Sequence, residues 1–541
     1  MKLNNRLKRR GSMCSDTLRE EAPRARRSGG REARKAARAG GAAKRAIWPG
    51  MSGGQYRPLS ESDIRRINDT ALMILENIGI GDPSQDLLEV AIPAGCIHDR
   101  EHNRIRFPRA LVEDLIAVAA TEYVMYGVDP RHDQEIKGER VIFSTSGEAI
   151  SILDFASGHY RPSTLVDLYD AARLADHLEN IHAFGQTFIA SELSGDVPLH
   201  DINIAYAQLA GTSKPFALGI AMADNVDTII AMFDTFRGRE GAFLERPFCT
   251  FGGCPIVSPL RFGSDNLEVL IKTARLGLTG DIAVAAQAGA TAPAALAGAL
   301  AQTFAETLGC LCVTNLIRPG SALNFGMWPF ISDLRTGAFS GGSGEEALVI
   351  AAAAQICNHY GLITSMPSGM SDSKLMDAQA GYEKGITTLA AALAGSNMVC
   401  HYPGMLGSLI GMSFEGMVID DDMAGNVMRV LRGIEVNDAT LSYDVIHDTV
   451  FGAGHFLGSA QTLELMESEY LYPHTADRRT PGEWEHSGKQ DILELAHGRT
   501  RRILSTHYPE HIDPAVDASI RSRFPIRLER ADMAPGCRRW S

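Results

Sequence analysis

Short runs of apolar residues alternate with longer amphipathic segments over most of the chain. The apolar runs have the length of buried β-strands, and most are followed by a loop rich in Gly, Pro or Ser and then by a helical pattern. The expected strands are Val141–Ser144, Ile181–Thr187, Phe216–Ala221, Phe248–Phe251, Ile282–Gln287, Ala322–Phe325, Leu362–Met366 and Met398–His401. The clearest expected helices are Asn266–Leu276, Pro293–Leu308 and Glu345–His359.

The spacing of these strands predicts the architecture. Successive strands begin mostly about 30 to 40 residues apart, which is the length of one strand-plus-helix unit. Eight such units predict the α/β class and a (β/α)8 TIM barrel over residues 141–438. An open doubly wound sheet is the competing architecture, although no G-x-G-x-x-G fingerprint follows a strand with an acidic residue at the expected distance. Residues 141–153 also fit a β-hairpin.

Three further segments flank the predicted barrel. Residues 56–140 predict an N-terminal helical region, whose first helix starts after the capping residue Ser60. Residues 439–541 predict a C-terminal helical extension packed on the outside of the barrel. Residues 1–55 contain basic clusters and no apolar core, which favours a disordered tail over a targeting segment or a nucleic-acid or membrane arm.

Charge and cysteine content narrow the function. The 541-residue chain has a formal net charge of −13, and its first 50 residues carry 15 Lys/Arg against four Asp/Glu. The rest of the chain is therefore strongly acidic, which argues against nucleic-acid binding. Nine cysteines without a framework pattern indicate reduced thiols and a cytoplasmic protein. Because no run of about 20 apolar residues is evident, we expect no membrane span.

The common catalytic and metal motifs are absent from the sequence. It contains no G-x-S-x-G elbow, no P-loop and no H-E-x-x-H. Cys310 and Cys312 lie near expected strand positions, but zinc needs three or four converging ligands, so buried thiols are expected. The run Asp420–Asp422 is interpreted as charging the N-terminal turn of a helix. We therefore predict no metal site.

One polar segment follows a predicted strand, where barrel enzymes place their chemistry. It is SGMSDSKLMDAQAGYEK, residues 368–384. Asp372 is a possible cap of the next helix, and Gln379 shares a helix face with Tyr382 and Glu383. The segment therefore offers an aromatic ring beside a carboxylate, although a capped helix with a polar stripe explains the same pattern.

A second segment is aromatic and also follows a predicted strand. In NFGMWPFISDLRTGAF, residues 324–339, aromatic side chains surround Asp333 and Arg335. Such rings are usually part of the core. They can also bind a quaternary ammonium ion, which has no N–H to donate and is held by ring faces. Arg335 would then be able to bind a substrate carboxylate bidentately, as in a betaine.

Several motifs along residues 55–525 resemble the trimethylamine methyltransferase-like family of corrinoid-dependent enzymes. The matching motifs are Arg318-Pro319-Gly320, Asp333-x-Arg335-Thr336-Gly337, Asp372-Ser373-Lys374, DAQAGYEK at 377–384, Gly404-Met405-Leu406, Ser413-x-Glu415 and Gly454-His455-Phe456-Leu457. The resemblance implies a TIM barrel that passes a methyl group to Co(I) of a cobalamin, the cofactor, carried by a separate corrinoid protein. The family's histidine-rich stretch after the last motif is replaced here by Gly458–Thr462.

A second departure from the family narrows the substrate. Members of the family that act on trimethylamine contain pyrrolysine, whereas every position here is a standard residue. A neutral tertiary amine must be activated before it can lose a methyl group. A quaternary ammonium ion leaves as a neutral tertiary amine, so Co(I) can attack it without an acid or a side-chain nucleophile. The expected substrate is therefore a betaine-like quaternary amine.

The resemblance and the two segments give a set of expected site residues. Asp372 and Glu383 are expected as catalytic electrostatic partners. The expected substrate-binding residues are Phe325, Trp328, Arg335, Phe339, Gln379 and Tyr382, and the expected openings for the cofactor are Gly252, Gly289 and Gly404. We also expect a homo-oligomer. A TIM-barrel lyase or hydrolase and a non-catalytic amine-binding protein are the alternative functions.

Overall fold

The computed structural model describes residues 45–536 and 538–540, which form two compact units. The larger unit takes in the described residues of 47–434 and 471–540 and contains all the expected site residues. The described part of the other unit includes residues 435–470, with helices α14 (Asp438–Leu441), α15 (Tyr443–Val450) and α16 (Ala460–Leu465). Most of the predicted basic tail lies outside the described residues.

Each of the eight expected strands overlaps an observed strand. They are β7 (Arg140–Phe143), β10 (Phe184–Gly185), β11 (Phe216–Gly219), β12 (Cys249–Gly253), β15 (Gly280–Val284), β17 (Leu323–Met327), β20 (Ser365–Pro367) and β21 (Met398–Cys400). Their residues are largely buried, which explains why they read as continuous apolar runs instead of alternating patterns.

These strands pair with one another in parallel. One sheet has the order β10-β11-β12-β15-β17, and in another β21 lies between β7 and β20. Isolated parallel bridges pair Ser144 with Ala183 and Phe325 with Thr364. The next strand along the chain, β8 (Ser151–Leu153), pairs with β9 (Tyr160–Pro162) and β23 (Gly411–Met412). The hairpin alternative for residues 141–153 is therefore wrong, and the fold is α/β.

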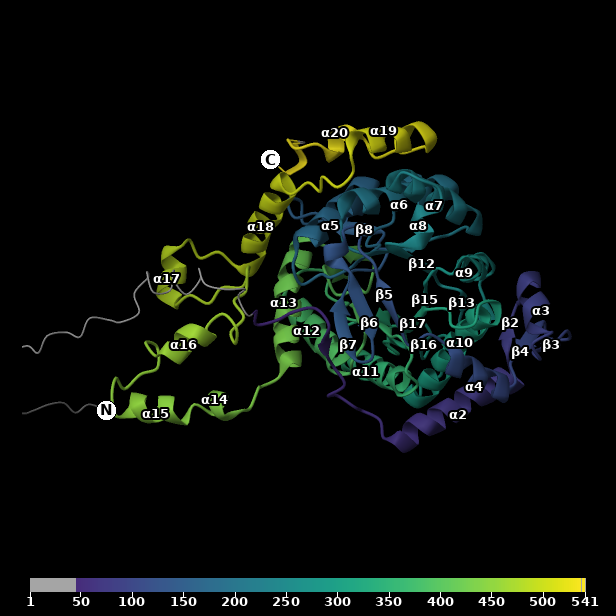
Figure 1. Cartoon of the computed structure of the whole chain (residues 1–541), viewed down its shortest axis with the longest axis horizontal. Coiled ribbons are helices and arrows are strands. Elements are labelled where there is room, and N and C mark those ends of the chain that lie inside the picture. The colour runs from purple at the N-terminus through teal and green to yellow at the C-terminus, as the bar shows by residue number, and fades with distance from the viewer. Residues whose placement is uncertain (1–44, 537, 541) are drawn as a thin grey trace, which may run out of the picture. The chain divides into compact units, whose positions relative to one another are not determined.

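Helices alternate with these strands and lie outside them (Figure 1). They are α5 (Leu165–His177), α6 (Val197–Gly211), α7 (Ala223–Arg237), α9 (Ser264–Leu276), α10 (Leu296–Ile317), α11 (Gly344–His359), α12 (Ala378–Leu393) and α13 (Phe414–Arg432). Helix α10 is long and apolar enough to cross a membrane, but 83% of its most apolar stretch is buried inside the protein. It is therefore a core helix. Because α10 extends to Ile317, Cys310 and Cys312 lie on a helix and not near a strand.

The N-terminal region packs against this core. Helix α2 (Glu61–Asn77) starts with a capping box between Ser60 and Asp63 and contacts α10, and α3 (Gln85–Ala91) and α4 (Arg109–Val118) follow. Five short strands occur between α2 and β7. They are β2 (Ile80–Gly81), β3 (Ile97–Asp99) and β4 (Arg104–Arg106), which precede α4, and β5 (Glu122–Met125) and β6 (Gln134–Lys137), which follow it. The sequence did not reveal them, because two to four residues show too little alternation to identify a strand.

The acidic run Asp420–Asp422 does not lie in the first turn of a helix, as expected, but in the middle of α13. All three side chains are buried. Asp420 pairs with Lys384 at 3.0 Å and accepts a hydrogen bond from the backbone N–H of Gly404. Asp422 accepts hydrogen bonds from three successive backbone N–H groups at residues 474–476. These carboxylates thus anchor neighbouring segments instead of charging a helix terminus.

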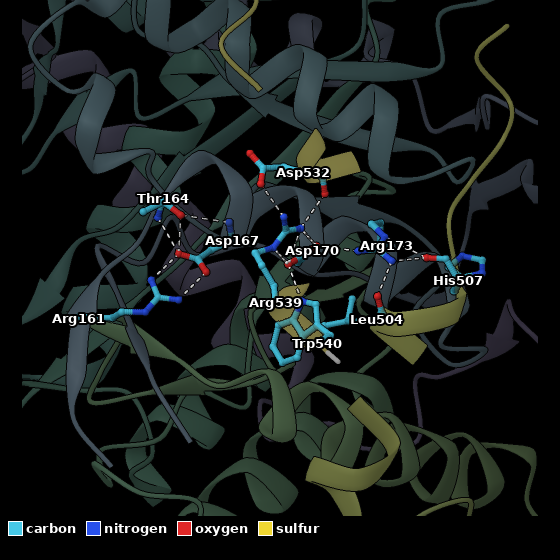
Figure 2. A network of polar contacts seen from close by, with 10 residues as sticks. All are labelled: Arg161, Thr164, Asp167, Asp170, Arg173, Leu504, His507, Asp532, Arg539 and Trp540. Carbon is cyan, nitrogen blue, oxygen red and sulfur yellow. Dashed lines mark hydrogen bonds and ion pairs between the residues drawn. The ribbon is translucent and has the colours of Figure 1, made fainter. Parts of the chain in front are cut away.

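The C-terminal segment packs on three helices of the core. It contains α17 (Pro481–His486), α18 (Ile492–Thr506), α19 (Pro514–Arg523) and α20 (Arg530–Met533); α18 contacts α13 and α5, and α19 contacts α7. Figure 2 shows how its end is held on α5. Asp170 accepts hydrogen bonds from Arg173, Arg539 and Trp540. We refer to these four residues as the C-terminal latch.

Candidate functional site

A cavity of about 560 Å³ lies at the carboxyl ends of the parallel strands. Most of its lining residues belong to, or closely follow, β7, β10, β11, β12, β15, β17, β20 and β21. Its volume is in the range that accommodates one small molecule. The carboxyl ends of strands are also where α/β enzymes place their chemistry, because the loops that follow can vary without disturbing the core.

One side of the cavity is acidic. Glu148 follows β7, and its side chain faces the cavity. Its backbone has a φ of +48°, a conformation that residues other than glycine rarely adopt. No described residue donates a hydrogen bond to its carboxylate. A Cβ at Gly219 would lie 2.0 Å from Glu148 Oε1, so glycine at that position leaves room for the carboxylate.

Two further acceptors beside Glu148 lack donors within the described part of the chain. Gln186 Oε1 is buried and unpaired, and the amide nitrogen donates weakly to the backbone of Phe188. Asp201 Oδ1 lies 3.5 Å from His200 Nδ1 and accepts no hydrogen bond, whereas Oδ2 is held by Asn225 and two backbone N–H groups. Buried acceptors normally find a donor, so these oxygens indicate a place for a ligand.

Two carboxyl groups of the cavity have raised pKa values. Burial raises the pKa of Glu148, and the charge of Asp201 adds to this effect while His200 opposes it. Burial also raises the pKa of Asp281 to about 6, opposed by a hydrogen bond from Thr250 Oγ1. A cation bound nearby would favour the ionised form of both groups, and the ionised carboxylates would in turn attract the cation.

The other side of the cavity is aromatic. Trp328 and Phe330 follow β17, three strands along the sheet from β11. Trp328 Nε1 donates to the backbone oxygen of Ser365 at 2.8 Å, and its ring meets that of His401 edge to face at 4.7 Å. Phe330 is backed by Phe339, with ring centroids 4.7 Å apart. The fixed rings offer faces to a cation.

His401 is the second cavity residue with an unusual backbone. Its φ is +74°, its ring is buried, and Nδ1 lies 3.2 Å from the thiol of Cys400. Burial lowers the pKa of His401 to about 3, so the ring is uncharged near neutral pH. It contributes polarity and shape to the cavity without adding positive charge.

The expected aromatic residues are only partly brought together. Trp328 lines the cavity, and Phe339 supports Phe330 from behind. Phe325, by contrast, points away from the cavity and packs against Phe304 of α10, 6.1 Å between ring centroids. Successive side chains of a strand face opposite sides, so the neighbours of an inward-facing residue point at the helices.

The expected carboxylate clamp lies elsewhere. Arg335 does not line the cavity, its side chain is 88% exposed, and it is chelated by Asp333 two residues earlier. Tyr382 is on the outer face of α12 and is 56% exposed. Neither residue can contact a ligand inside the cavity in this arrangement.

The distinctive segment at 368–384 forms a structural network. Glu383 accepts hydrogen bonds from Ser371 Oγ, the backbone N–H of Asp372 and the side-chain amide of Gln379. Asp372 in turn accepts from Ser340, Gly341 and Ser408, and so joins three loops. Because these carboxylate oxygens are already paired within the protein, the network explains the residue types without a ligand.

The three expected cofactor glycines have local structural reasons. Gly252 lines the cavity, and a Cβ there would collide with the carbonyl oxygen of Asp281 at 1.8 Å. Gly289 and Gly404 have φ of +88° and +78° and do not line the cavity. Glycine is favoured at both because side chains rarely adopt this conformation.

Sequence reasoning missed the acidic side of the cavity. Glu148 lies four residues after the expected strand Val141–Ser144, and Gln186 lies near the end of the expected strand Ile181–Thr187. The rule that chemistry lies at the carboxyl ends of strands could therefore have pointed to both residues. Asp201 belongs to no recognisable sequence motif and reaches the cavity from α6, and Asp281 lies within β15. The rule about strand ends therefore does not point to either residue. No group of three or more metal-binding side chains occurs among the residues that the structure describes.

Comparison with known proteins places the chain in a family. Residues 27–531 match the family model described as trimethylamine methyltransferase (MTTB). The chain belongs to the trimethylamine methyltransferase family. A glycine betaine methyltransferase from Desulfitobacterium hafniense (strain Y51) is 30% identical over 470 residues, covering 86% of this chain and 96% of the relative. Trimethylamine methyltransferase MttB from Methanosarcina thermophila is also 30% identical, with the same coverage.

Membership of the trimethylamine methyltransferase family decides the class of reaction. The chain is a methyltransferase, which answers the choice that the sequence left open between methyl transfer and a lyase, hydrolase or binding role. Among solved structures, the monomethylamine methyltransferase MtmB of Methanosarcina barkeri covers 84% of this chain with a TM-score of 0.45 and 11% identity.

Proposed function

We propose that this chain transfers a methyl group from a quaternary amine, bound in the cavity, to the reduced cobalt of a corrinoid carried by a separate protein. The observation that carries the proposal is the cavity itself, in which the rings of Trp328 and Phe330 and the unpaired carboxylate of Glu148 are combined. Ring faces and a carboxylate are the groups that bind a cation without N–H donors.

The residues of the cavity are suited to binding and orientation. Transfer breaks one N–CH3 bond, and both electrons of that bond remain on nitrogen, so the leaving group is a neutral tertiary amine. No proton has to be supplied and no side-chain nucleophile is needed. The protein has only to hold the N–CH3 bond in line with the acceptor and to exclude water, which proximity and desolvation accomplish.

The corrinoid is expected to reach the site from outside. A reduced corrinoid supplies Co(I), a strong nucleophile that accepts the methyl group. The cavity has the size of a single small ligand, so it fits the amine and leaves the corrinoid at its mouth, on the partner protein. The relative named glycine betaine methyltransferase supports a quaternary amine as the donor.

The visible spectrum of cob(I)alamin tests the proposal. Purified protein is mixed anaerobically with cob(I)alamin and a panel of mono-, di-, tri- and tetra-substituted methylamines. We expect the Co(I) absorption to decline and methylcobalamin to form with quaternary amines only. Absence of methylcobalamin with every amine, despite a folded protein and an added corrinoid protein, would refute it.

We also infer that the two parallel sheets form one closed (β/α)8 barrel. The bridges from Ser144 to Ala183 and from Phe325 to Thr364 support this, because they join the ends of the two sheets. The backbone N–H of His182 donates to Phe143 and that of Phe325 to Ile363 at these junctions. Slow amide exchange at His182 and Phe325, as slow as within β15, is the expected result; rapid exchange at both would indicate an open sheet.

We further propose a cytoplasmic homo-oligomer that works with the corrinoid protein. Light scattering after size-exclusion chromatography is expected to give a mass that is a multiple of the chain's 58.4 kDa. A mass of one chain at all concentrations would show that it is a monomer.

A further inference from the structure

The charged side chains that line the cavity are mainly carboxylates. Three carboxylates line it, from Glu148, Asp201 and Asp281, and no Lys or Arg is among the described residues of the lining. Of the two histidines in the lining, His401 is uncharged near neutral pH, and His200 lies against Asp201, 3.5 Å from its carboxylate. A zwitterionic substrate such as a betaine would bring its own carboxylate beside those of the lining, without a Lys or Arg to pair with it.

Three buried polar side-chain atoms of the described lining lack a partner, and two of them are oxygens that only accept hydrogen bonds: Gln186 Oε1 and Asp201 Oδ1. The third is Nε2 of His200, whose other ring nitrogen, Nδ1, lies 3.5 Å from Asp201 Oδ1. A hydrogen on Nδ1, directed at Asp201, leaves Nε2 of the neutral ring as an acceptor as well. A substrate carboxylate has no hydrogen to donate to them, whereas a hydroxyl group does. Because a buried acceptor without a donor is costly, these atoms favour a substrate that carries a hydroxyl group over one that carries a carboxylate.

We propose that the cavity selects a quaternary ammonium substrate that lacks a carboxylate and bears a hydroxyl group on its longest arm. Glu148 is the counter-ion of the ammonium group, the ring of Trp328 covers its methyl groups, and Gln186 Oε1 accepts a hydrogen bond from the hydroxyl group. This inference rests on the proposed function and names the substrate class of the same site. It replaces the betaine-like substrate and the Arg335 clamp that the sequence suggested.

The geometry at Glu148 supports its role as counter-ion. Its carboxylate faces the cavity without a donor from the described chain, and Gly219 keeps the space beside it free. A structural carboxylate would be paired, as Asp372 and Glu383 are. A cation in the cavity therefore supplies the interaction that the fold leaves out.

Binding measurements without corrinoid test the proposal. Calorimetry on the full chain compares choline with glycine betaine, tetramethylammonium and the neutral isostere 3,3-dimethyl-1-butanol. We expect choline to bind at least about ten-fold more tightly than glycine betaine and than the neutral isostere. Glu148→Gln should weaken choline binding at least about ten-fold. The matched surface variant Glu245→Gln, whose side chain is 62% exposed and pairs with Arg239, should not change it.

A second variant isolates the hydroxyl group. Gln186→Leu should weaken choline binding and leave tetramethylammonium binding unchanged, since only choline has a hydroxyl group. Circular dichroism and the unfolding temperature of each variant show that it is folded. Equal or tighter binding of glycine betaine, or choline affinity that is unchanged in Glu148→Gln, overturns the inference.

The cobalamin assay separates this inference from the proposed function. If glycine betaine alone binds and methylates cob(I)alamin, the methyltransferase proposal stands and the substrate class is wrong. If choline binds as expected but no amine methylates cob(I)alamin even with corrinoid protein, the substrate class stands and the transfer proposal fails. If none of the four compounds binds, the inference is overturned.

Discussion

Glu148 combines two features that are unfavourable in the folded chain alone. A left-handed backbone at a residue other than glycine costs on the order of 1 kcal/mol or more, and its φ is +48°. The protein around the cavity also desolvates its carboxyl group, which raises its pKa. Such strain concentrates at functional sites. Both features position a negative charge at the cavity, and a bound cation offsets their cost.

At the same scale, the ring of Trp328 should account for much of the cation affinity. We expect Trp328→Ala to weaken choline binding about ten-fold, equivalent to about 1.4 kcal/mol, and Trp328→Phe to retain most of it. Calorimetry measures both variants. Equal losses from the two would show that the indole N–H bond to Ser365 matters and the ring face does not.

The carboxyl groups of the cavity make binding pH-dependent. The pKa of Asp281 is raised to about 6, so this group is partly protonated in mildly acidic solution, and burial also raises the pKa of Glu148. Cation binding requires the ionised forms, and affinity for choline should therefore rise with pH through about 6. His401 stays uncharged in this range, because its pKa is about 3.

Two variants assign this titration. Asp281→Asn should lower choline affinity at neutral pH and flatten the rise around pH 6, as followed by calorimetry in buffers of equal ionic strength. His200→Gln should leave the rise in place, which separates His200, the other titratable ring of the lining, from the carboxyl groups. An unchanged profile in Asp281→Asn would remove this residue from the binding site.

At the scale of elements, the strands were predictable from sequence and the site was not. Apolar runs such as Phe216–Ala221 identify strands because buried parallel strands are apolar on both faces. Helical spacing correctly put Gln379 and Glu383 on one face, where they are hydrogen-bonded. It does not say whether that face turns to a cavity or to other loops. Glu148, in the loop after β7, and Asp201, on α6, come together only through tertiary structure.

The pairing of α12 with α13 shows what the polar segment at residues 368–384 does for stability. Lys384 is buried, pairs with Asp420 at 3.0 Å and donates to the backbone oxygens of Gly369 and Tyr402. Asp420→Ala leaves a buried ammonium without its counter-ion, and we expect a loss of about 3–5 kcal/mol in the free energy of unfolding. Urea denaturation followed by tryptophan fluorescence measures it.

A surface pair provides the control for this variant. Arg239 and Glu245 are both more than half exposed, and Glu245→Ala should cost less than about 1 kcal/mol. A loss of similar size in Asp420→Ala would mean that the buried pair contributes no more than a surface pair.

At the scale of the larger unit, contacts between segments far apart in sequence hold the C-terminal segment on the core. Arg173 of α5 is fully buried and donates to the backbone oxygens of Leu504 and His507 as well as to Asp170, as Figure 2 shows. The ring of Trp540 lies against Phe414 of α13, 5.4 Å between centroids. The C-terminal latch thus joins α5 and α13. Earlier segments of the chain on the way to these helices, at residues 144–148 and at Leu409, help to line the cavity.

The latch predicts an order of stability among variants. Asp170→Ala removes the carboxylate from the buried Arg173 and from Arg539 and Trp540 at once, so it should lower the unfolding temperature most. Trp540→Phe keeps the ring contact with Phe414 and loses one hydrogen bond at 2.8 Å, which costs about 1.5–3 kcal/mol for a bond to a charged group. Removing residues 538–541 should lower the unfolding temperature by an amount between those of the two variants, because Asp170 then keeps its hydrogen bond from Arg173. Differential scanning fluorimetry at a fixed scan rate ranks the three, since a chain of this size often unfolds irreversibly. If Trp540→Phe were as damaging as Asp170→Ala, the indole bond and not the buried Arg173–Asp170 pair would hold the segment in place.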